Sequence, residues 1–282
     1  MNNALLSSLN QKIASFHSLQ VVEGYYLVLG GGKIGNDFLR YAKERSFPFV
    51  VVIDIDEAAE ASNNSIAVER KKLLSLIGTY KESKESESNA YFHCMDVRDI
   101  PLILEAGIPE YIIPAVPTHA LANMAIDLLG SVYSRPLISD ISIKERDEKQ
   151  IAYFHNIISE LPEEIVVFNS HSDAVIMLSY AKMGEICPDN CLGAEKYCYN
   201  FNRKKPETIT AYVRELLSTH KGWMFESYQM KPGIGGIKGI EFKEHLLSIM
   251  EHVNYPRLKS VSLSFYVPFK RTEDYGIVDM YP

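Results

Sequence analysis

Two patterns of apolar and polar positions alternate along the first half of the chain. Compact apolar runs, several of them β-branched, are typical of strands buried on both faces of a parallel sheet. They lie at residues 25–30, 49–54, 90–95, 111–115 and 136–140. Segments with helical spacing lie between them, at residues 33–45, 66–77, 100–106 and 119–129, and the polar stretch 79–89 predicts a surface loop. This alternation predicts an α/β fold with a doubly wound, mainly parallel sheet of the Rossmann type.

The same reading divides the chain into three parts. Apolar residues near helical spacing in residues 1–24 predict a helix that packs on the core, and residues 25–140 form the predicted Rossmann domain. Residues 141–282 form a predicted second α/β or α+β domain. Its expected helices are 147–160, 173–183, 207–220 and 240–252, and its expected strands are 165–169, 222–229 and 260–268. A Cys-rich irregular loop at 187–198 and a Gly-rich loop at 231–239 complete it.

Composition and charge narrow the classes of partner. The chain has 282 residues, 46% of them hydrophobic and 23% charged, as in ordinary folded, soluble proteins. A net charge of −7 with no long basic run argues against nucleic-acid and anionic-membrane binding. Because the N-terminal residues lack the pattern of a secretory signal and no apolar run is long enough to span a bilayer, we expect a cytoplasmic protein with reduced thiols.

A glycine motif follows the first predicted strand. Residues 30–35, GGGKIG, fit G-x-G-x-x-G between a strand and a helix, and Asp54 ends the next strand, 19 residues after Gly35. In dinucleotide-binding folds these glycines allow a tight turn, close approach to a pyrophosphate and helix–strand packing, while the acid accepts hydrogen bonds from a ribose. An acid at this position disfavours a 2′-phosphate, so the motif favours NAD(H) over NADP. S-adenosylmethionine sites also pair a glycine loop with such an acid, and a glycine turn that binds nothing is the plain alternative.

Residues 25–130 resemble the nucleotide-binding domain of potassium-uptake regulators, the TrkA-N or RCK type. The matching stretches are LVLGGGKIG, VVIDID and MDVRDIPLILEAGIPEYIIPAV. The resemblance implies that NAD(H) is bound by Gly30, Gly32 and Gly35, with the intervening Lys33 and Ile34, and by Asp54. It also implies that Asp96 lies near the adenine or its ribose. Nothing in the second half resembles that family's C-terminal ligand module.

Two histidines are candidates for proton transfer. His119 follows the fourth predicted strand in PAVPTH, where ligands of doubly wound sheets bind, and His171 follows a later strand in NSHSD. An imidazole titrates near neutral pH and can supply or accept the proton that accompanies hydride transfer to a carbonyl. The alternative for each is a polar residue at a helix N-terminus with no chemical role.

Three of the four cysteines are clustered. Cys187, Cys191 and Cys198 have a C-x3-C-x6-C spacing, and three thiolates on one loop can converge on zinc or an iron–sulfur cluster. The spacing matches no common zinc-ribbon or ferredoxin pattern, so a redox pair and plain packing thiols remain alternatives.

The Gly-rich loop 231–239 is the candidate for binding the substrate. Backbone amides of Gly233, Gly235 and Gly236, with Lys238, would grip a carboxylate or phosphate there; a flexible connector is the alternative.

Three functions follow from these features. The favoured one is an NAD(H)-dependent oxidoreductase acting on a small anionic substrate. The others are a non-catalytic sensor of nucleotide or redox state and an S-adenosylmethionine-dependent, methyltransferase-like protein. We expect a small-molecule ligand and a homo-oligomer, with a dimer as its simplest form.

Overall fold

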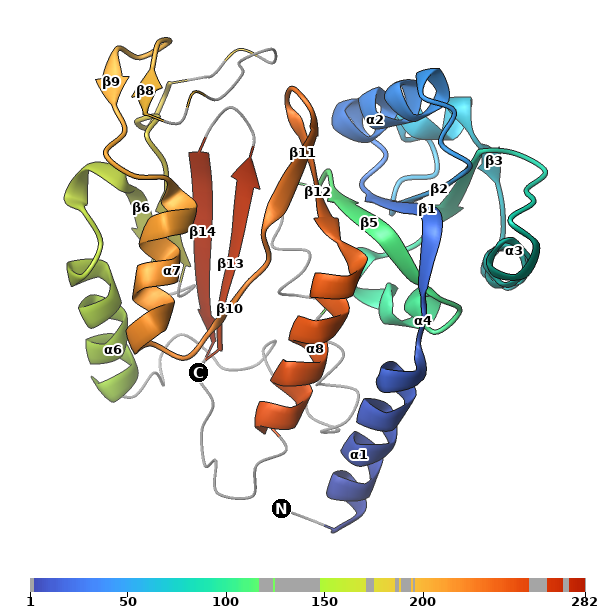
Figure 1. Cartoon of the computed structure of the whole chain (residues 1–282), viewed down its shortest axis with the longest axis horizontal. Helices are drawn as coiled ribbons and strands as arrows, with labels where there is room; N and C mark the ends of the chain where they lie inside the picture. Colours follow the sequence, from blue (N-terminus) through green and yellow to red (C-terminus); the bar gives the residue numbers. More distant parts are fainter. Residues whose placement is uncertain are drawn as a thin grey trace. The chain divides into compact units, whose positions relative to one another are not determined.

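The computed structural model describes residues 3–116, 124, 148–170, 175–185, 188, 194, 196–253, 263–270 and 274–281. The chain divides into two compact units, Met1–Leu137 with Gly236–Pro256, and Ile138–Gly235 with Arg257–Pro282. The sequence assigned all of residues 141–282 to one domain, whereas the division returns Gly236–Pro256 to the first unit. The reason is α8 (Gly239–Val253), whose buried face packs in the first unit against α1 (Asn3–Ser18) and β5 (Ile108–Pro114). Figure 1 shows α1 and α8 side by side.

A seven-stranded, mostly parallel sheet forms the centre of the fold. Its strand order is β11-β12-β5-β1-β2-β4-β3. The bounds are β1 (Val21–Leu29), β2 (Phe49–Asp54), β3 (Ile66–Ala67), β4 (Ala90–Cys94), β11 (Ser227–Lys231) and β12 (Ile234–Lys238). Strands β4, β2, β1 and β5 are parallel, and β12 joins β5 antiparallel. The run β4-β2-β1-β5 is the third-second-first-fourth order of a Rossmann half, so the predicted α/β class and Rossmann-type sheet are confirmed.

Helices cover both faces of this parallel run. In α2 (Lys33–Glu44) the buried residues Gly35, Phe38, Leu39 and Ala42 have the i, i+3, i+4, i+7 spacing of one helical face. Phe38 lies against Tyr26 of β1, with ring centroids 6.2 Å apart. On the other face Tyr80 of α3 (Arg70–Ser83) stacks on Phe49 at 4.6 Å, and Phe49 meets Tyr25 edge to face. Because neighbouring residues of a strand point to opposite faces, Tyr25 and Tyr26 anchor different helices.

Three local expectations in this unit were wrong. Residues 66–67 form the short strand β3, paired with β4, so the predicted helix 66–77 begins only at Arg70. The polar stretch 79–89 was expected to be a loop, but α3 continues to Ser83 because Tyr80 is buried in the aromatic stack beneath it. The short α4 (Pro101–Leu104) replaces the longer helix expected at 100–106. The expected strand 136–140 and helix 119–129 lie outside the described residues, apart from the buried Met124.

The second unit contains a five-stranded sheet of order β10-β13-β14-β7-β6. Its strands are β6 (Val166–Ser170), β7 (Val175–Leu178), β10 (Trp223–Met224), β13 (Leu263–Lys270) and β14 (Asp274–Tyr281). All neighbours are antiparallel except the parallel pair β10 and β13. Between β7 and β10 in the sequence, β8 (Tyr197–Cys198) and β9 (Arg203–Lys204) form a separate two-stranded hairpin. The mixed, mostly antiparallel sheet gives this unit an α+β character.

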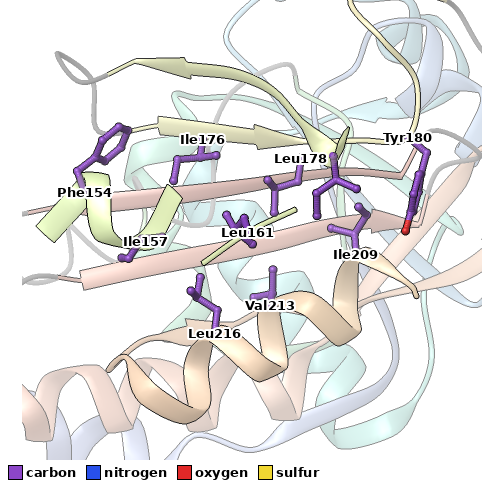
Figure 2. Packing of buried hydrophobic residues seen from close by; sticks show 10 residues of the cluster. Phe154, Ile157, Leu161, Ile176, Leu178, Tyr180, Ile209, Val213 and Leu216 are labelled. Atoms are coloured by element: carbon purple, nitrogen blue, oxygen red, sulfur yellow. The ribbon is translucent and has the colours of Figure 1, made fainter. Parts of the chain in front are cut away.

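The core of the second unit joins two helices to one face of that sheet. Ile176 and Leu178 of β7 project to the same side, as residues two apart in a strand must. Phe154 and Ile157 come from α6 (Glu148–Ser159), and α7 (Ile209–Thr219) contributes Ile209, Val213 and Leu216. Figure 2 shows these side chains converging between the strand and α7. Thr208 is the N-cap of α7, and its Oγ1 accepts the N–H of Ala211 at 3.1 Å.

Three further expectations in this unit were wrong. Residues 173–183 were expected to form a helix, but 175–178 form β7, because this continuous apolar run pairs with β6 on one side and β14 on the other. The expected strand 222–229 is divided between β10 and β11. The expected irregular loop 187–198 ends in β8, the first strand of the hairpin β8–β9. The Arg203 guanidinium in β9 binds both carboxylate oxygens of Glu185 at 2.5 Å.

Candidate nucleotide-binding site

The turn after β1 is shaped by two glycines that the fold itself requires. Gly30 has a φ of +105°, a conformation that L side chains rarely adopt, and its N–H donates to the carbonyl of Ile53 at 2.8 Å. A Cβ on Gly35 would lie 1.9 Å from the carbonyl oxygen of Gly30. The first turn of α2 therefore rests directly on the end of β1, as the third glycine of a dinucleotide-binding motif allows.

Gly32 differs from both of these glycines. It is the N-cap of α2, with φ −69° and ψ −162°, angles that any L residue adopts. A Cβ built on it meets no atom within 4 Å. Neither backbone strain nor packing within the described chain explains why this position is glycine. Its exposed backbone adjoins the first turn of α2, and helix N-termini are places where anions bind.

Asp54 connects the glycine turn to the end of β2. Its Oδ2 accepts the N–H of Gly31 at 2.5 Å, and its Oδ1 accepts the N–H of Asp56 at 2.9 Å. The carbonyl of Gly31 in turn accepts the N–H of Ala61 at 2.8 Å. Each carboxylate oxygen keeps a further lone pair for another donor such as a ribose hydroxyl. The carboxylate is thus held in one orientation at the sheet edge where the glycine turn lies.

A 3₁₀ turn closes one side of the site. In this turn (Glu60–Asn64), Asn64 donates its Nδ2 to the Oδ1 of Asn36 at 2.8 Å, and Asn36 donates to Glu60 at 3.4 Å. Asn36 belongs to the first turns of α2, so these amides tie the segment after β2 to the helix that begins at the glycines. The sequence analysis missed both asparagines, because only the tertiary fold brings residues 36 and 64 together.

Cys94 and Asp96 follow at the end of the neighbouring strand β4. The Cys94 thiol donates to the carbonyl of Ile55 at 3.3 Å. Burial, followed by the negative charges of Glu57, Asp54 and Asp56, raises the pKa of this thiol above its ordinary value. Asp96 is half-buried in the next turn, where its carbonyl accepts the N–H of Asp99 at 3.0 Å. A glycine turn and several acidic residues therefore lie at the ends of β1, β2 and β4.

Other candidates from the sequence fall in two groups. His119, His171, Cys187 and Cys191 lie outside the described residues. Cys198 is described: it is buried in β8, opposite Arg203 in register. Within the described ranges, no group of three or more His, Cys, Asp or Glu residues is placed to hold a metal ion. The zinc or iron–sulfur hypothesis therefore stays a prediction.

The Gly-rich loop expected at 231–239 is instead a β-hairpin. Pro232 and Gly233 form the turn between β11 and β12, and Gly233 has the positive φ, +80°, that a type II turn requires after proline. Gly235 and Gly236 are buried within β12, and a Cβ on Gly235 would lie 2.1 Å from Ser227 Oγ. Lys238 lies 3.3 Å from Glu241. Hairpin geometry accounts for Gly233 and Gly235, so the expected loop is wrong at 231–239, while anion binding by Gly233, Gly235, Gly236 and Lys238 stays a prediction.

The fold and this site define an α/β protein with a mostly parallel, Rossmann-type sheet and a glycine turn facing an acid. A family model described as "Uncharacterized protein, C-terminal domain" matches residues 136–261. The chain is also similar to an uncharacterized protein of Archaeoglobus fulgidus, with 26% identity over 215 residues that cover 76% of this chain and 84% of the relative. No solved structure matches. Among the described residues, no helix is long and apolar enough to cross a membrane.

Proposed function

We propose that the first unit binds a dinucleotide, NAD(H), at the turn formed by residues 30–35. The observation that carries the proposal is the contrast among the three glycines. Gly30 and Gly35 are explained by backbone conformation and packing, whereas Gly32 is explained by neither. A ligand that approaches the backbone closely explains a glycine there, and a pyrophosphate at a helix N-terminus is such a ligand.

Asp54 supports the same ligand at its adenosine end. Two backbone N–H groups hold its carboxylate beside the glycine turn, ready to accept hydrogen bonds from ribose hydroxyls. Its negative charge repels a 2′-phosphate, so the unit should bind NAD(H) in preference to NADP(H). Lys33 is exposed at the first position of α2, next to Gly32, and so lies on the proposed pyrophosphate side.

We propose further that the bound dinucleotide serves hydride transfer to or from a small anionic substrate, with His119 as the proton donor or acceptor. Replacing His119 with alanine tests this step. A large loss of turnover with unchanged NADH affinity supports catalysis. Unchanged turnover would remove His119 from the reaction. NADH binding without any turnover by the wild-type protein would favour a sensor.

S-adenosylmethionine is the second candidate ligand, because Asp54 suits the ribose of either molecule. The two ligands differ in the group beyond the adenosine: the dinucleotide carries an anionic pyrophosphate, and S-adenosylmethionine carries a cationic sulfonium. A Cβ on Gly32 would meet no atom within 4 Å, and Gly32 lies at a helix N-terminus, which favours anions. Both observations support the dinucleotide over S-adenosylmethionine.

The test is a pair of glycine variants. Gly32→Ala places a methyl group where the pyrophosphate is proposed to lie, while Gly78→Ala adds a methyl group that likewise meets nothing within 4 Å, but on α3. We expect Gly32→Ala to weaken NADH binding at least about tenfold, a loss of about 1.4 kcal/mol. Because alanine is a poorer N-cap than glycine, the melting temperature should fall slightly, by about 1–4 °C for a cost of about 0.5–1 kcal/mol.

Titration of NADH fluorescence measures the affinity, and circular dichroism checks the fold. Gly78→Ala should keep wild-type affinity for NADH. Equal affinity of the Gly32→Ala and wild-type proteins would refute the placement of the pyrophosphate. Binding of S-adenosylmethionine with no binding of NADH would replace the proposed ligand with the second candidate.

A further inference from the structure

The segment directly after Asp54 carries more negative charge than one ribose-binding acid requires. We call residues 54–57, Asp-Ile-Asp-Glu, the acidic turn. Two successive side chain–backbone hydrogen bonds hold it: Asp54 accepts the N–H of Asp56, and the Oδ1 of Asp56 accepts the N–H of Ala58, each at 2.9 Å. Such turns fix the direction of the chain. Asp56 and Glu57 are exposed.

The charges of this turn converge on one small region at the ends of β2 and β4. The Cys94 thiol at the end of β4 donates to the carbonyl of Ile55, within the acidic turn, at 3.3 Å. Burial and then the carboxylates of Glu57, Asp54 and Asp56 raise the pKa of this thiol. Asp54 directs both its oxygens to backbone N–H groups. The carboxylates of Asp56 and Glu57 therefore add to its negative charge on the side where the chain leaves β2.

The sequence supplies no cation on this segment to offset that charge. Between Arg45 and Arg70 the chain has no lysine or arginine. NADP-binding sheets commonly place an arginine near this position to accommodate the 2′-phosphate. If the ribose of a ligand lies against Asp54, the 2′ position of that ribose faces a segment that has aspartate and glutamate but no lysine or arginine.

We infer that Asp56 and Glu57 are specificity-determining residues that, together with Asp54, exclude a 2′-phosphate from the ribose position. The inference rests on the proposed dinucleotide function and names the determinants of its ligand choice. Neither residue is needed to bind NADH, since their charges act on a phosphate that NADH lacks. They act through space, so their effect should weaken as salt screens the charges.

The experiment compares two double variants with the same change of charge. Asp56→Asn/Glu57→Gln removes the two charges and keeps an amide oxygen at residue 56 that can accept the N–H of Ala58. Glu85→Gln/Glu87→Gln removes two exposed charges from the segment between α3 and β4 and is the control. Dissociation constants for NADH and NADPH are measured for both and for the wild type, at low salt and at 0.15 M salt.

We expect the first variant to bind NADPH about five- to tenfold more tightly at low salt, from two charges each acting across roughly 7 Å of high-dielectric surroundings. NADH affinity should stay the same, and the gain should shrink at 0.15 M salt. The control should leave both constants unchanged.

The outcomes separate the two proposals. If the wild-type protein binds neither dinucleotide, the proposed function fails and the inference fails with it. If NADH binds but the acidic-turn variant changes the ratio of the two constants no more than the control, the inference alone is overturned. Circular dichroism of each variant confirms that the comparison is made between folded proteins.

Discussion

Replacing Gly35 with alanine tests the close contact between α2 and β1 on which the candidate site is built. The added Cβ would lie 1.9 Å from the carbonyl oxygen of Gly30 and 3.4 Å from Val28 Cγ1. Ordinary van der Waals contact begins near 3.4 Å, so helix and strand must separate by about 1.5 Å. The obstructing atom is backbone and cannot rotate away.

The expected cost follows from this overlap. Overpacking of a buried site costs about 1–3 kcal/mol and at times more, and here we expect the upper end, about 3 kcal/mol. For a unit of this size each kcal/mol lowers the melting temperature by about 2–4 °C, which gives a decrease of about 6–12 °C. Because the glycine turn shifts with the helix, NADH affinity should fall as well.

Thermal unfolding followed by far-ultraviolet circular dichroism measures the effect. Gly78→Ala is the matched control: alanine in a helix interior is about 0.5–1 kcal/mol more favourable than glycine, so its melting temperature should rise slightly. If Gly35→Ala melted within about 2 °C of the wild type, less than 1 kcal/mol on the same scale, the contact between α2 and Gly30 would not be as close as described.

Three other predictions concern the remaining packing and charge. Leu216→Ala should destabilise the second core by about 2–5 kcal/mol in urea unfolding, while Glu215→Ala, exposed on the same helix, should change it by less than about 0.5 kcal/mol; equal effects would contradict the described face of α7. Burial and then the charge of Glu110 raise the pKa of Tyr26 to about 12 from 10.0. The stability linked to neutral Tyr26 is thus fully present below pH 10 and is lost as the pH rises to 12, about 2–3 kcal/mol in all. Urea midpoints from pH 9 to 11 should fall less steeply for Tyr26→Phe, and parallel slopes would refute this. Lys243 donates to the carbonyls of His17 and Leu19 at 2.9 and 2.6 Å, so Lys243→Met should speed proteolysis near residue 18, and an unchanged cleavage rate would show that these bonds do not hold α1.

Much of the first unit could be predicted from the sequence because its signals are local. The β-branched run at 49–54 is buried on both faces of a parallel sheet, and Phe38, Leu39 and Ala42 mark the inner face of α2. The glycine motif and Asp54 lie at neighbouring strand ends, because successive parallel strands direct their carboxyl ends to one edge. The site's two main elements were therefore expected together.

The second unit was predicted less well because its signals are non-local. The run 175–178 contains Ile, Met and Leu, which a helix also accepts, and only pairing with β6 and β14 makes it a strand. The glycines at 233, 235 and 236 suggested a flexible loop, but a positive φ at the turn and the close approach of Ser227 explain two of them within a hairpin. In the first case the deciding partner, β14, is distant in sequence. In the second, the contact between Gly235 and Ser227 cannot be read from the spacing of apolar and polar residues.

The sequence by itself determined the α/β class, the amphipathic helices and the glycine motif with its acid, since each depends on spacing within a short segment. Tertiary structure alone decided that residues 236–256 return to the first unit and that Tyr80 extends α3. It also decided that Gly32, unlike Gly30 and Gly35, has no packing reason to be glycine. That distinction depends on which atoms surround a Cβ, and those atoms come from strands and turns that only folding brings together.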